Sequence, residues 1–219
     1  MHNCLVGSEM CIRDSTQTVL TDKPSEVIEN NEVDLVVELM GGLLPARDLV
    51  KAALEKSKPV ITANKELLSK EGKYLFMLAG ERNVDLLFEA AVAGGIPLIR
   101  VLRESLLGEP VEKIMGIVNG TTNYILSQME ENGMPYSEAL LEAQKLGYAE
   151  SDPTADVSGQ DAASKAAIIA MVAFGADVSL DDVLFEGIQN ISSADVAFAS
   201  RAGCALSLIH ISEPTRQLC

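Results

Sequence analysis

Residues 33–40 (VDLVVELM) form a largely apolar run that carries three valines and ends at Gly41 and Gly42. Such a run, rich in β-branched residues and closed by a turn signal, is typical of a strand buried on both faces of a parallel sheet. Two similar runs follow along the chain, at 59–63 (PVITA) and 84–91 (VDLLFEAA). The sequence therefore predicts three buried strands.

Helical periodicity separates these strands. Apolar residues recur at helical spacing over 45–56 and 65–82, with a break expected near Gly72, and a short helix is predicted at 24–31. The resulting β-α-β-α-β alternation predicts a parallel, doubly wound, Rossmann-like sheet of the α/β class.

The second half of the chain predicts an α+β domain. A strand is expected at 111–118 and a polar, acidic loop at 147–158. The expected helices span residues 97–106, 121–131, 137–146, 159–175 and 194–201. We place the domain boundary in the stretch AGGIP (93–97), so that the two domains cover 16–94 and 95–203.

The charge balance excludes several classes of protein. The 219 residues include 17 Lys and Arg against 32 Asp and Glu, a net charge of −15. A surface for nucleic acid or anionic membrane needs a basic patch, which this composition disfavours. The longest apolar run, 166–174, is about half of what a membrane span needs, and no secretory signal follows Met1. We expect a cytoplasmic protein without nucleic-acid or membrane partners.

Cysteine and histidine occur only near the ends of the chain. All four Cys and both His lie within 1–15 or 204–219, so the body offers no disulfide framework and little for zinc. Both end segments also lose the periodicity of the body and look like translated adapter read-through. We expect them to be foreign tails that make no stable contact with the body.

A single lysine interrupts the apolar helix expected at 159–175. Lys165 is its only charged residue from position 162 onward, and Asp161 lies one helical turn earlier. An apolar environment desolvates a lysine, and the acid-before-base order favours an i,i+4 ion pair. The pair is therefore either a catalytic element or an ordinary pair on a helix surface.

An acidic cluster precedes this helix. Glu150, Asp152, Asp156 and Asp161 fall within 12 positions, with no basic residue before Lys165. Such carboxylates repel one another unless a cation lies among them, and that cation is a metal, the lysine or a substrate ammonium. The spacing does not fit a calcium-binding EF-hand loop. A solvated acidic loop is the simpler alternative.

Residues 143–165 (AQKLGYAESDPTADVSGQDAASK) resemble the signature of the homoserine dehydrogenase family, A-x-x-x-G followed by D-P-x-x-D-[apolar]-x-G-x-D-x-x-x-K. Every defined position of the signature is filled. Other segments that resemble the same family are VVELMGG (36–42), TANK (62–65), EAAVAGGIP (89–97) and GIVNGTTNYIL (116–126). The resemblance covers about 16–203.

The resemblance implies an oxidoreductase that interconverts L-homoserine and L-aspartate 4-semialdehyde with NAD or NADP, in the synthesis of threonine, methionine and isoleucine. It implies that Lys165 is the proton donor and that Asp161 completes the catalytic pair. The implied substrate residues are Glu150, Asp156, Asp161 and Lys65. The implied cofactor residues are Lys65, Gly147, Glu150 and Gly41. A sodium-type monovalent cation is implied at Glu89, Val92, Gly94 and Ile96, and a homodimer through the sheet of the second domain, which leaves an apolar face of 111–118 exposed in a monomer.

One element of the dinucleotide-binding pattern is missing from the chain. No G-x-G-x-x-G is present, and Gly7 is the only glycine before Gly41. We therefore expect the body to begin after the first β-α-β unit and to end inside the catalytic domain, as a fragment that is inactive alone. Two alternatives stay open: a non-redox metal- or small-molecule-binding α/β domain that uses the acidic loop 150–161, and a related dehydrogenase. The latter would usually use Cys or His as its catalyst, and the body has neither.

Overall fold

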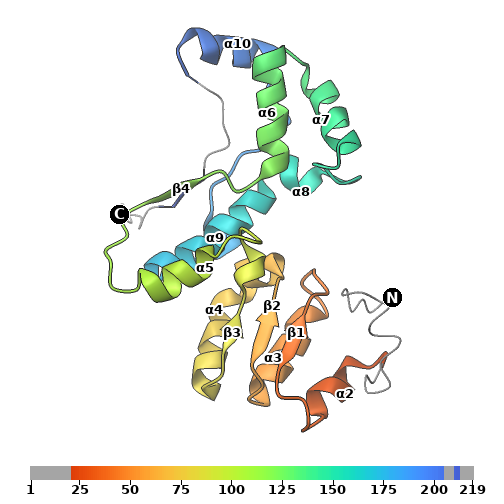
Figure 1. The fold of residues 1–219 in the computed structure, drawn as a ribbon, viewed down its shortest axis with the longest axis vertical. Helices are drawn as coiled ribbons and strands as arrows, with labels where there is room; N and C mark the ends of the chain where they lie inside the picture. The colour runs from red at the N-terminus through yellow and green to blue at the C-terminus, as the bar shows by residue number, and fades with distance from the viewer. Residues whose placement is uncertain (1–20, 205–209, 213–219) are drawn as a thin grey trace. The chain divides into compact units, whose positions relative to one another are not determined.

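Three short parallel strands organise the first part of the molecule. In the computed structural model, which describes residues 21–204 and 210–212, β1 (Val36–Glu38), β2 (Val60–Thr62) and β3 (Leu86–Leu87) pair in the order β1-β2-β3 (Figure 1). The parallel β-α-β-α-β arrangement is confirmed. Each strand is shorter than its apolar run, and the run at 84–91 ends in a 3₁₀ helix, η1 (Glu89–Ala91).

Two helices cover one face of this sheet. The helix α3 (Ala46–Glu55) contacts β1 and β2, α4 (Lys65–Arg82) contacts β3, and the two helices pack on each other. This face buries Val60 and Leu86. Right-handed crossovers place successive helices on the same side of a parallel sheet, which accounts for the arrangement. The preceding helix, α2 (Pro24–Glu29), packs on α3.

The other face of β1 differs from the prediction of a strand buried on both faces. Leu35, Val37 and Leu39 are 43%, 55% and 54% exposed among the described residues. The alternation of side chains along a strand explains this result, because α3 and α4 cover only the face that Glu38 shares.

The break predicted near Gly72 is wrong. Helix α4 runs without interruption, and Gly72 is buried in it. A glycine costs a helix about 1 kcal/mol relative to alanine, which the packing of the buried face of α4 offsets. The helix expected at 97–106 forms as α5 (Leu98–Arg100), which continues directly as a π-helix, η2 (Val101–Ser105).

The second compact unit, Leu106–Cys219, follows the first, Met1–Ser105. It contains β4 (Ile114–Gly116), α6 (Gly120–Asn132), α7 (Tyr136–Lys145), α8 (Thr154–Val157), α9 (Gln160–Phe174), η3 (Leu180–Asp182), α10 (Ser193–Arg201) and β5 (His210–Ser212). Ile125, Met129, Ala139 and Ala143 are fully or almost fully buried between α6 and α7. The short helix α8 lies where the sequence predicted only a loop.

The C-terminal segment also departs from the prediction that it makes no contact with the body. Strand β5 pairs antiparallel with β4, with Met115 opposite Ile211. An edge strand offers unpaired backbone groups that any extended segment can bond, so this pairing needs no selected side chains. The exposed apolar face predicted at 111–118 is confirmed, since Met115 and Ile117 are 56% and 53% exposed.

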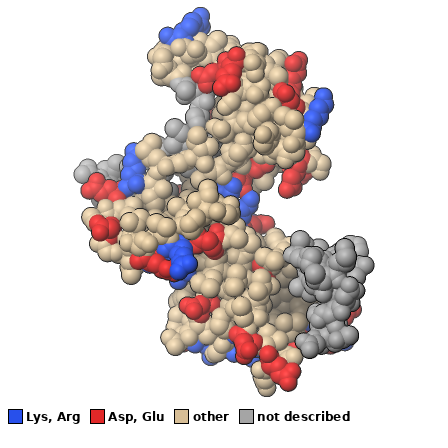
Figure 2. Space-filling view, in the orientation of Figure 1, with Lys and Arg blue, Asp and Glu red and all other residues tan. Residues whose placement is uncertain are grey.

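Acidic side chains are spread over the face of the molecule shown in Figure 2. Among the described residues on the face shown in Figure 2, Lys and Arg are dispersed between Asp and Glu and form no continuous basic patch. Within 21–204 and 210–212, no helix is both long enough and apolar enough to cross a membrane.

Candidate active site

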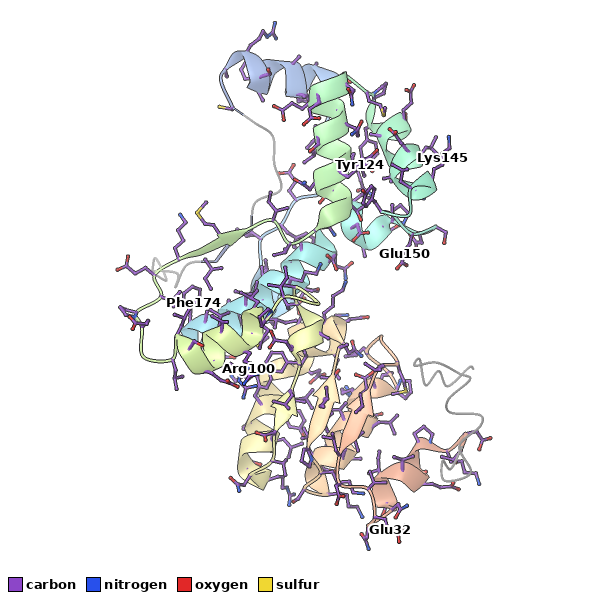
Figure 3. The ribbon with its side chains drawn as sticks, in the orientation of Figure 1. Glu32, Arg100, Tyr124, Lys145, Glu150 and Phe174 are labelled. Atoms are coloured by element: carbon purple, nitrogen blue, oxygen red, sulfur yellow. The ribbon has the colours of Figure 1, made fainter. Side chains whose placement is uncertain are left out.

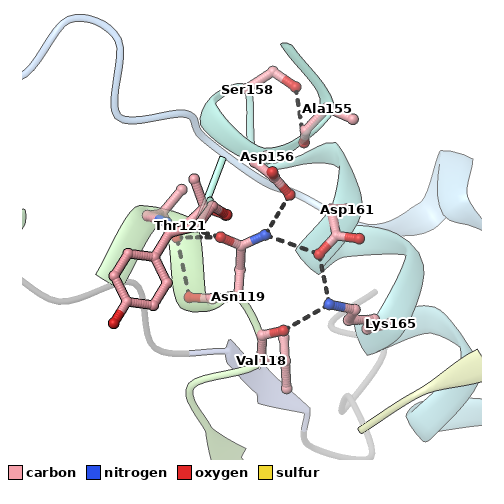
Figure 4. Close-up of polar contacts among 10 residues, drawn as sticks. Val118, Asn119, Thr121, Ala155, Asp156, Ser158, Asp161 and Lys165 are labelled. Atoms are coloured by element: carbon pink, nitrogen blue, oxygen red, sulfur yellow. Dashed lines mark hydrogen bonds and ion pairs between the residues drawn. The ribbon is translucent and has the colours of Figure 1, made fainter. Parts of the chain in front are cut away.

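The ion pair predicted on the apolar helix is formed. Lys165 Nζ lies 2.7 Å from Asp161 Oδ2, and the two side chains are 18% and 3% exposed. Lys165 Nζ also donates to the carbonyl oxygen of Val118 at 2.7 Å (Figure 4). A pair this deeply buried is not the solvated helix-surface pair that the sequence left open.

The amide of Asn119 joins both carboxylates of the site. Its Nδ2 donates to Asp156 Oδ1 at 2.7 Å and to Asp161 Oδ2 at 2.9 Å. Its Oδ1 accepts from the backbone N–H of Thr122 at 2.8 Å, as the N-cap of α6. Sequence reasoning did not assign Asn119 a role, although Asn after a strand and before a helix is a signal for an N-cap.

Two glycines hold the beginning of α9 in place. Gly159, the N-cap of α9, has φ of 85°, and a Cβ there would lie 2.9 Å from the carbonyl oxygen of Glu186. At Gly187 a Cβ would lie 2.5 Å from the carbonyl oxygen of Val157. The segment around 187 therefore crosses the α8–α9 junction backbone to backbone, which only glycine permits. This crossing fixes the helical turn that carries Asp161.

The loop after α7 is anchored to the first turn of α6. Thr121 Oγ1 donates to the carbonyl oxygen of Tyr148 at 2.6 Å, and the rings of Tyr124 and Tyr148 stack at 4.8 Å. Desolvation, followed by the charge of Glu142, raises the pKa of Tyr124 above its usual value. Thr121 and Tyr148 were not among the predicted site residues.

The predicted residues Gly147 and Glu150 both lie in this anchored loop. Gly147 has φ of 80°, in the left-handed region that favours glycine. Gln144 Nε2 donates to the carbonyl oxygen of Glu150 at 3.1 Å, and the Glu150 side chain is exposed on the loop before α8 (Figure 3). The loop is therefore held by its backbone, which leaves the Glu150 carboxylate accessible.

The acidic cluster does not form one cation site. Asp156 and Asp161 converge on Asn119, whereas Asp152 is exposed and accepts from the hydroxyl and backbone N–H of Thr154 at 2.6 and 3.1 Å. These two hydrogen bonds, the hydroxyl first, lower the pKa of Asp152. Among the described residues, no three His, Cys, Asp or Glu side chains are grouped so that they could hold a metal ion. Within the cluster, Lys165 is the cation that pairs with Asp161.

In the first unit, buried polar groups meet at the carboxyl ends of β1 and β2. Glu38 is 4% exposed, and its carboxylate accepts from Thr62 Oγ1 at 2.6 Å and from the backbone N–H groups of Met40 and Gly41 at 2.8 and 3.3 Å. Glu38 and Thr62 are partners in the strand register, on the face that the helices cover. Ligands of open α/β sheets bind at this end of the strands.

The predicted cofactor residues Gly41 and Lys65 lie next to this network. Gly41 and Gly42 have φ of 73° and 71°. Asn64 Nδ2 donates to the carbonyl oxygen of Gly42 at 2.6 Å, and Asn64 caps α4, whose first residue is Lys65. The structure therefore brings the two glycines and Lys65 into one loop cluster of the first unit. Lys65 is half-buried there.

The four residues predicted to bind a monovalent cation lie between η1, which begins at Glu89, and the backbone turn at residues 93–96 in the first unit. Ile96 N donates to the carbonyl oxygen of Ala93 at 2.8 Å, and Gly95 has φ of 83°. The Glu89 carboxylate accepts from the backbone N–H groups of Ile99 and Arg100 at 3.1 and 2.8 Å. The Glu89 side chain therefore holds the backbone at the start of α5.

Comparison with known protein families identifies the family of this chain. Residues 97–217 match the family model described as homoserine dehydrogenase, and residues 8–89 match that of the homoserine dehydrogenase NAD binding domain. The chain belongs to the homoserine dehydrogenase family. The matched ranges enter both end segments, and the foreign origin of those ends stays a prediction.

Several individual relatives support the assignment. A homoserine dehydrogenase of Corynebacterium glutamicum is 52% identical over 195 residues, which cover 89% of this chain and 44% of the relative. The crystal structure of a homoserine dehydrogenase from Thiobacillus denitrificans superposes with a TM-score of 0.85 at 45% identity, over 90% of this chain and 46% of that one. A hyperthermophilic archaeal homoserine dehydrogenase in complex with NADPH gives a TM-score of 0.73 at 31% identity, over 90% of this chain and 57% of that one. The chain thus spans about half the length of the relatives it matches.

Proposed function

We propose that this protein interconverts L-homoserine and L-aspartate 4-semialdehyde with NAD or NADP. The observation that carries the proposal is the buried Asp161–Lys165 pair, which occupies the last two defined positions of the family signature. The 52% identity to a homoserine dehydrogenase supports it. The non-redox alternative loses its main argument, because the acidic loop divides between the Asn119 network and an exposed turn at Asp152.

Lys165 is the proposed proton donor. Its ammonium carries three N–H groups, of which Asp161 Oδ2 and the Val118 carbonyl engage two among the described residues, so one remains for a substrate oxygen. A bound nicotinamide cofactor would supply the hydride for reduction of the aldehyde. Negative charge then develops on the carbonyl oxygen, and a cationic acid at that point stabilises the charge and gives up its proton. In the reverse direction, neutral Lys165 takes the proton from the homoserine hydroxyl.

The remaining site residues are proposed for binding. Glu150, Asp156 and Asp161 supply the negative charge that suits the ammonium of an amino-acid substrate, and Lys65 is a further substrate and cofactor residue. Gly41, Gly147 and Glu150 are the other proposed cofactor residues. The two positive-φ glycines after β1 fit this role, since glycine lets the backbone approach a pyrophosphate closely.

Three further features complete the proposal. A sodium-type cation would bind the backbone of the segment that contains Glu89, Val92, Gly94 and Ile96, which the observed turn at residues 93–96 supports. The protein acts as a homodimer, which the exposed Met115 and Ile117 support. It works in the cytoplasm, where the biosynthesis of threonine, methionine and isoleucine would use its product.

A hybrid enzyme tests the activity. Residues 21–204 replace the aligned segment of the Corynebacterium glutamicum relative, which provides the rest of that enzyme's length. We expect the hybrid to reduce NAD or NADP only when L-homoserine is present, measured by nicotinamide absorbance. A hybrid that unfolds cooperatively with a melting temperature close to that of the parent enzyme, but shows no homoserine-dependent reduction of NAD or NADP, would refute the proposed function.

A further inference from the structure

Asn119 is the neutral residue that lies between the charged groups of the site, Asp156, Asp161 and Lys165. It is 4% exposed, and its side chain bonds to Asp156, Asp161 and Thr122. Its role as N-cap of α6 needs only the side-chain oxygen. The two N–H groups of the amide are therefore not explained by the helix cap.

The orientation of this amide is determined by its partners. Oδ1 faces the backbone N–H of Thr122, which can only donate, so Nδ2 must face the two carboxylates. Each N–H then serves a different carboxylate, Asp156 Oδ1 or Asp161 Oδ2. A neutral double donor between two negative groups permits them to lie close together without a metal ion.

The Asn119 amide and Lys165 also share one acceptor atom. Asp161 Oδ2 accepts from both Asn119 Nδ2, at 2.9 Å, and Lys165 Nζ, at 2.7 Å. The carbonyl of Val118, the residue before Asn119, takes a second N–H of Lys165. One short segment, residues 118–119, thus positions both members of the ion pair, as Figure 4 shows.

We propose that Asn119 is the positioning residue of this site: its amide holds Asp156 and Asp161 together and aims Asp161 at Lys165, so that a substrate ammonium meets two prearranged carboxylates. The proposal deepens the proposed function and rests on it for the identity of the ligand, L-homoserine. The hydrogen-bonded arrangement itself does not depend on that identity and can be tested separately.

Spectroscopy of the full chain tests the arrangement. In ¹⁵N-resolved NMR, the two side-chain amide protons of Asn119 should exchange with water more slowly than those of the exposed Asn132. The variant Asp156→Asn should shift one proton and Asp161→Asn the other, since each faces a different carboxylate. Fast exchange in the wild type, or no response to either variant, would overturn the proposal even if L-homoserine binds.

Binding of L-homoserine to the full chain tests the consequence. Asn119→Ser keeps an N-capping oxygen but loses both donors, and Asn119→Asp keeps the cap and adds a third carboxylate. We expect Asn119→Ser to weaken binding about tenfold and Asn119→Asp more, because a hydrogen bond to a charged group contributes at this level. Combining Asn119→Asp with Asp156→Asn restores the number of carboxylates and one hydrogen bond, and should recover part of the loss.

Two controls separate positioning from simple stability. Asn132→Asp makes the same charge change at the other end of α6, and Ser192→Ala removes the cap of α10. Both should change the L-homoserine dissociation constant by less than about twofold. Equal binding by wild type and Asn119→Ser would overturn the proposal. Absence of L-homoserine binding in the wild type would contradict the proposed function instead, and the amide spectra would then decide the positioning role alone.

Discussion

At the scale of single residues, burial distinguishes the Asp161–Lys165 pair from the other i,i+4 ion pairs found among the described residues. Its members are 18% and 3% exposed, whereas Lys70 and Glu66 form an equally short pair of 2.8 Å that is 37% and 42% exposed. Exposed pairs contribute at most about 1 kcal/mol, because water screens them and side-chain ordering opposes them. Breaking a buried pair leaves one group without its partner, which costs several times more.

This contrast gives a prediction for stability. Asp161→Asn should lower the free energy of unfolding by about 2–3 kcal/mol, somewhat less than for a fully buried pair because Lys165 keeps some contact with water. Glu66→Gln, the matched change in the exposed pair, should cost less than about 1 kcal/mol. Urea unfolding followed by circular dichroism measures both. Equal costs for the two variants would show that burial of the pair is not what distinguishes it.

The sequence predicted the charged members of this site but not its neutral ones. Asp161 and Lys165 are four positions apart on one helix, and this spacing alone predicts that their side chains are neighbours. Asn119 and Asp161 are 42 positions apart, and only the fold brings them together. Glu38 lies in the apolar run 33–40 and was not predicted to take part in a site. An acidic residue within a buried strand is nevertheless a signal for a polar network, because a buried charge needs partners.

At the scale of secondary-structure elements, the capping box of α10 gives a pH prediction. The hydroxyl of Ser192, followed by its backbone N–H, lowers the pKa of Asp195 below its usual range. A lowered folded-state pKa stabilises the helix at pH values above the ordinary aspartate pKa, and the contribution is lost as the pH falls through the lowered value.

The variant Ser192→Ala tests this directly. Removing the hydroxyl should move the pKa of Asp195 back toward its usual value, so that its carboxylate titrates at higher pH in a ¹³C NMR titration. The pKa of Asp182, which is lowered by the equivalent groups of Ser179 in the capping box of η3, should not change and serves as the control. An unchanged pKa of Asp195 would contradict the assigned cause.

The glycines at the two ends of α9, Gly159 and Gly175, both have positive φ but differ in the space available for a side chain. Gly159→Ala introduces both a strained positive φ and a contact of 2.9 Å with the backbone of Glu186, whereas Gly175→Ala has φ of 59° and no atom within 4 Å of the new Cβ. We expect Gly175→Ala to cost about 1 kcal/mol and Gly159→Ala at least about 2–3 kcal/mol, since strain and collision add. Thermal unfolding measures the difference, and equal losses would disprove the close crossing.

Element prediction worked best where pattern and packing agree. Helices α3, α4, α6, α7, α9 and α10 lie within a few residues of their predicted positions. The exposed face of β1 was missed because an apolar run does not show which neighbours cover it. Helix α8 was missed because Asp152 and Pro153 also fit a plain turn. In the structure, Asp152 accepts hydrogen bonds from Thr154, the first residue of the short helix.

At the scale of the whole molecule, the exposed apolar side chains of the second unit give a prediction for assembly. Met115 and Ile117 lie on the same face of the segment that contains β4 and are more than half exposed. A proposed homodimer would bury them, so light scattering should show a dimer of the full chain that Ile117→Glu converts to a monomer. The control Leu141→Glu changes an equally exposed residue, 56% accessible on α7, and should leave the dimer intact. A wild-type monomer at micromolar concentration would contradict the proposal.

The measurement that tests the central claim most directly is the turnover rate of the hybrid enzyme when Lys165 is replaced by Ala. Loss of a general acid typically reduces the rate about 10²–10⁴-fold, and kcat should fall far more than KM rises, since the interaction strengthens in the transition state. Lys145→Ala, at the exposed end of α7, should retain full turnover. If Lys165→Ala keeps more than about a tenth of the kcat of the unsubstituted hybrid, Lys165 is not the proton donor.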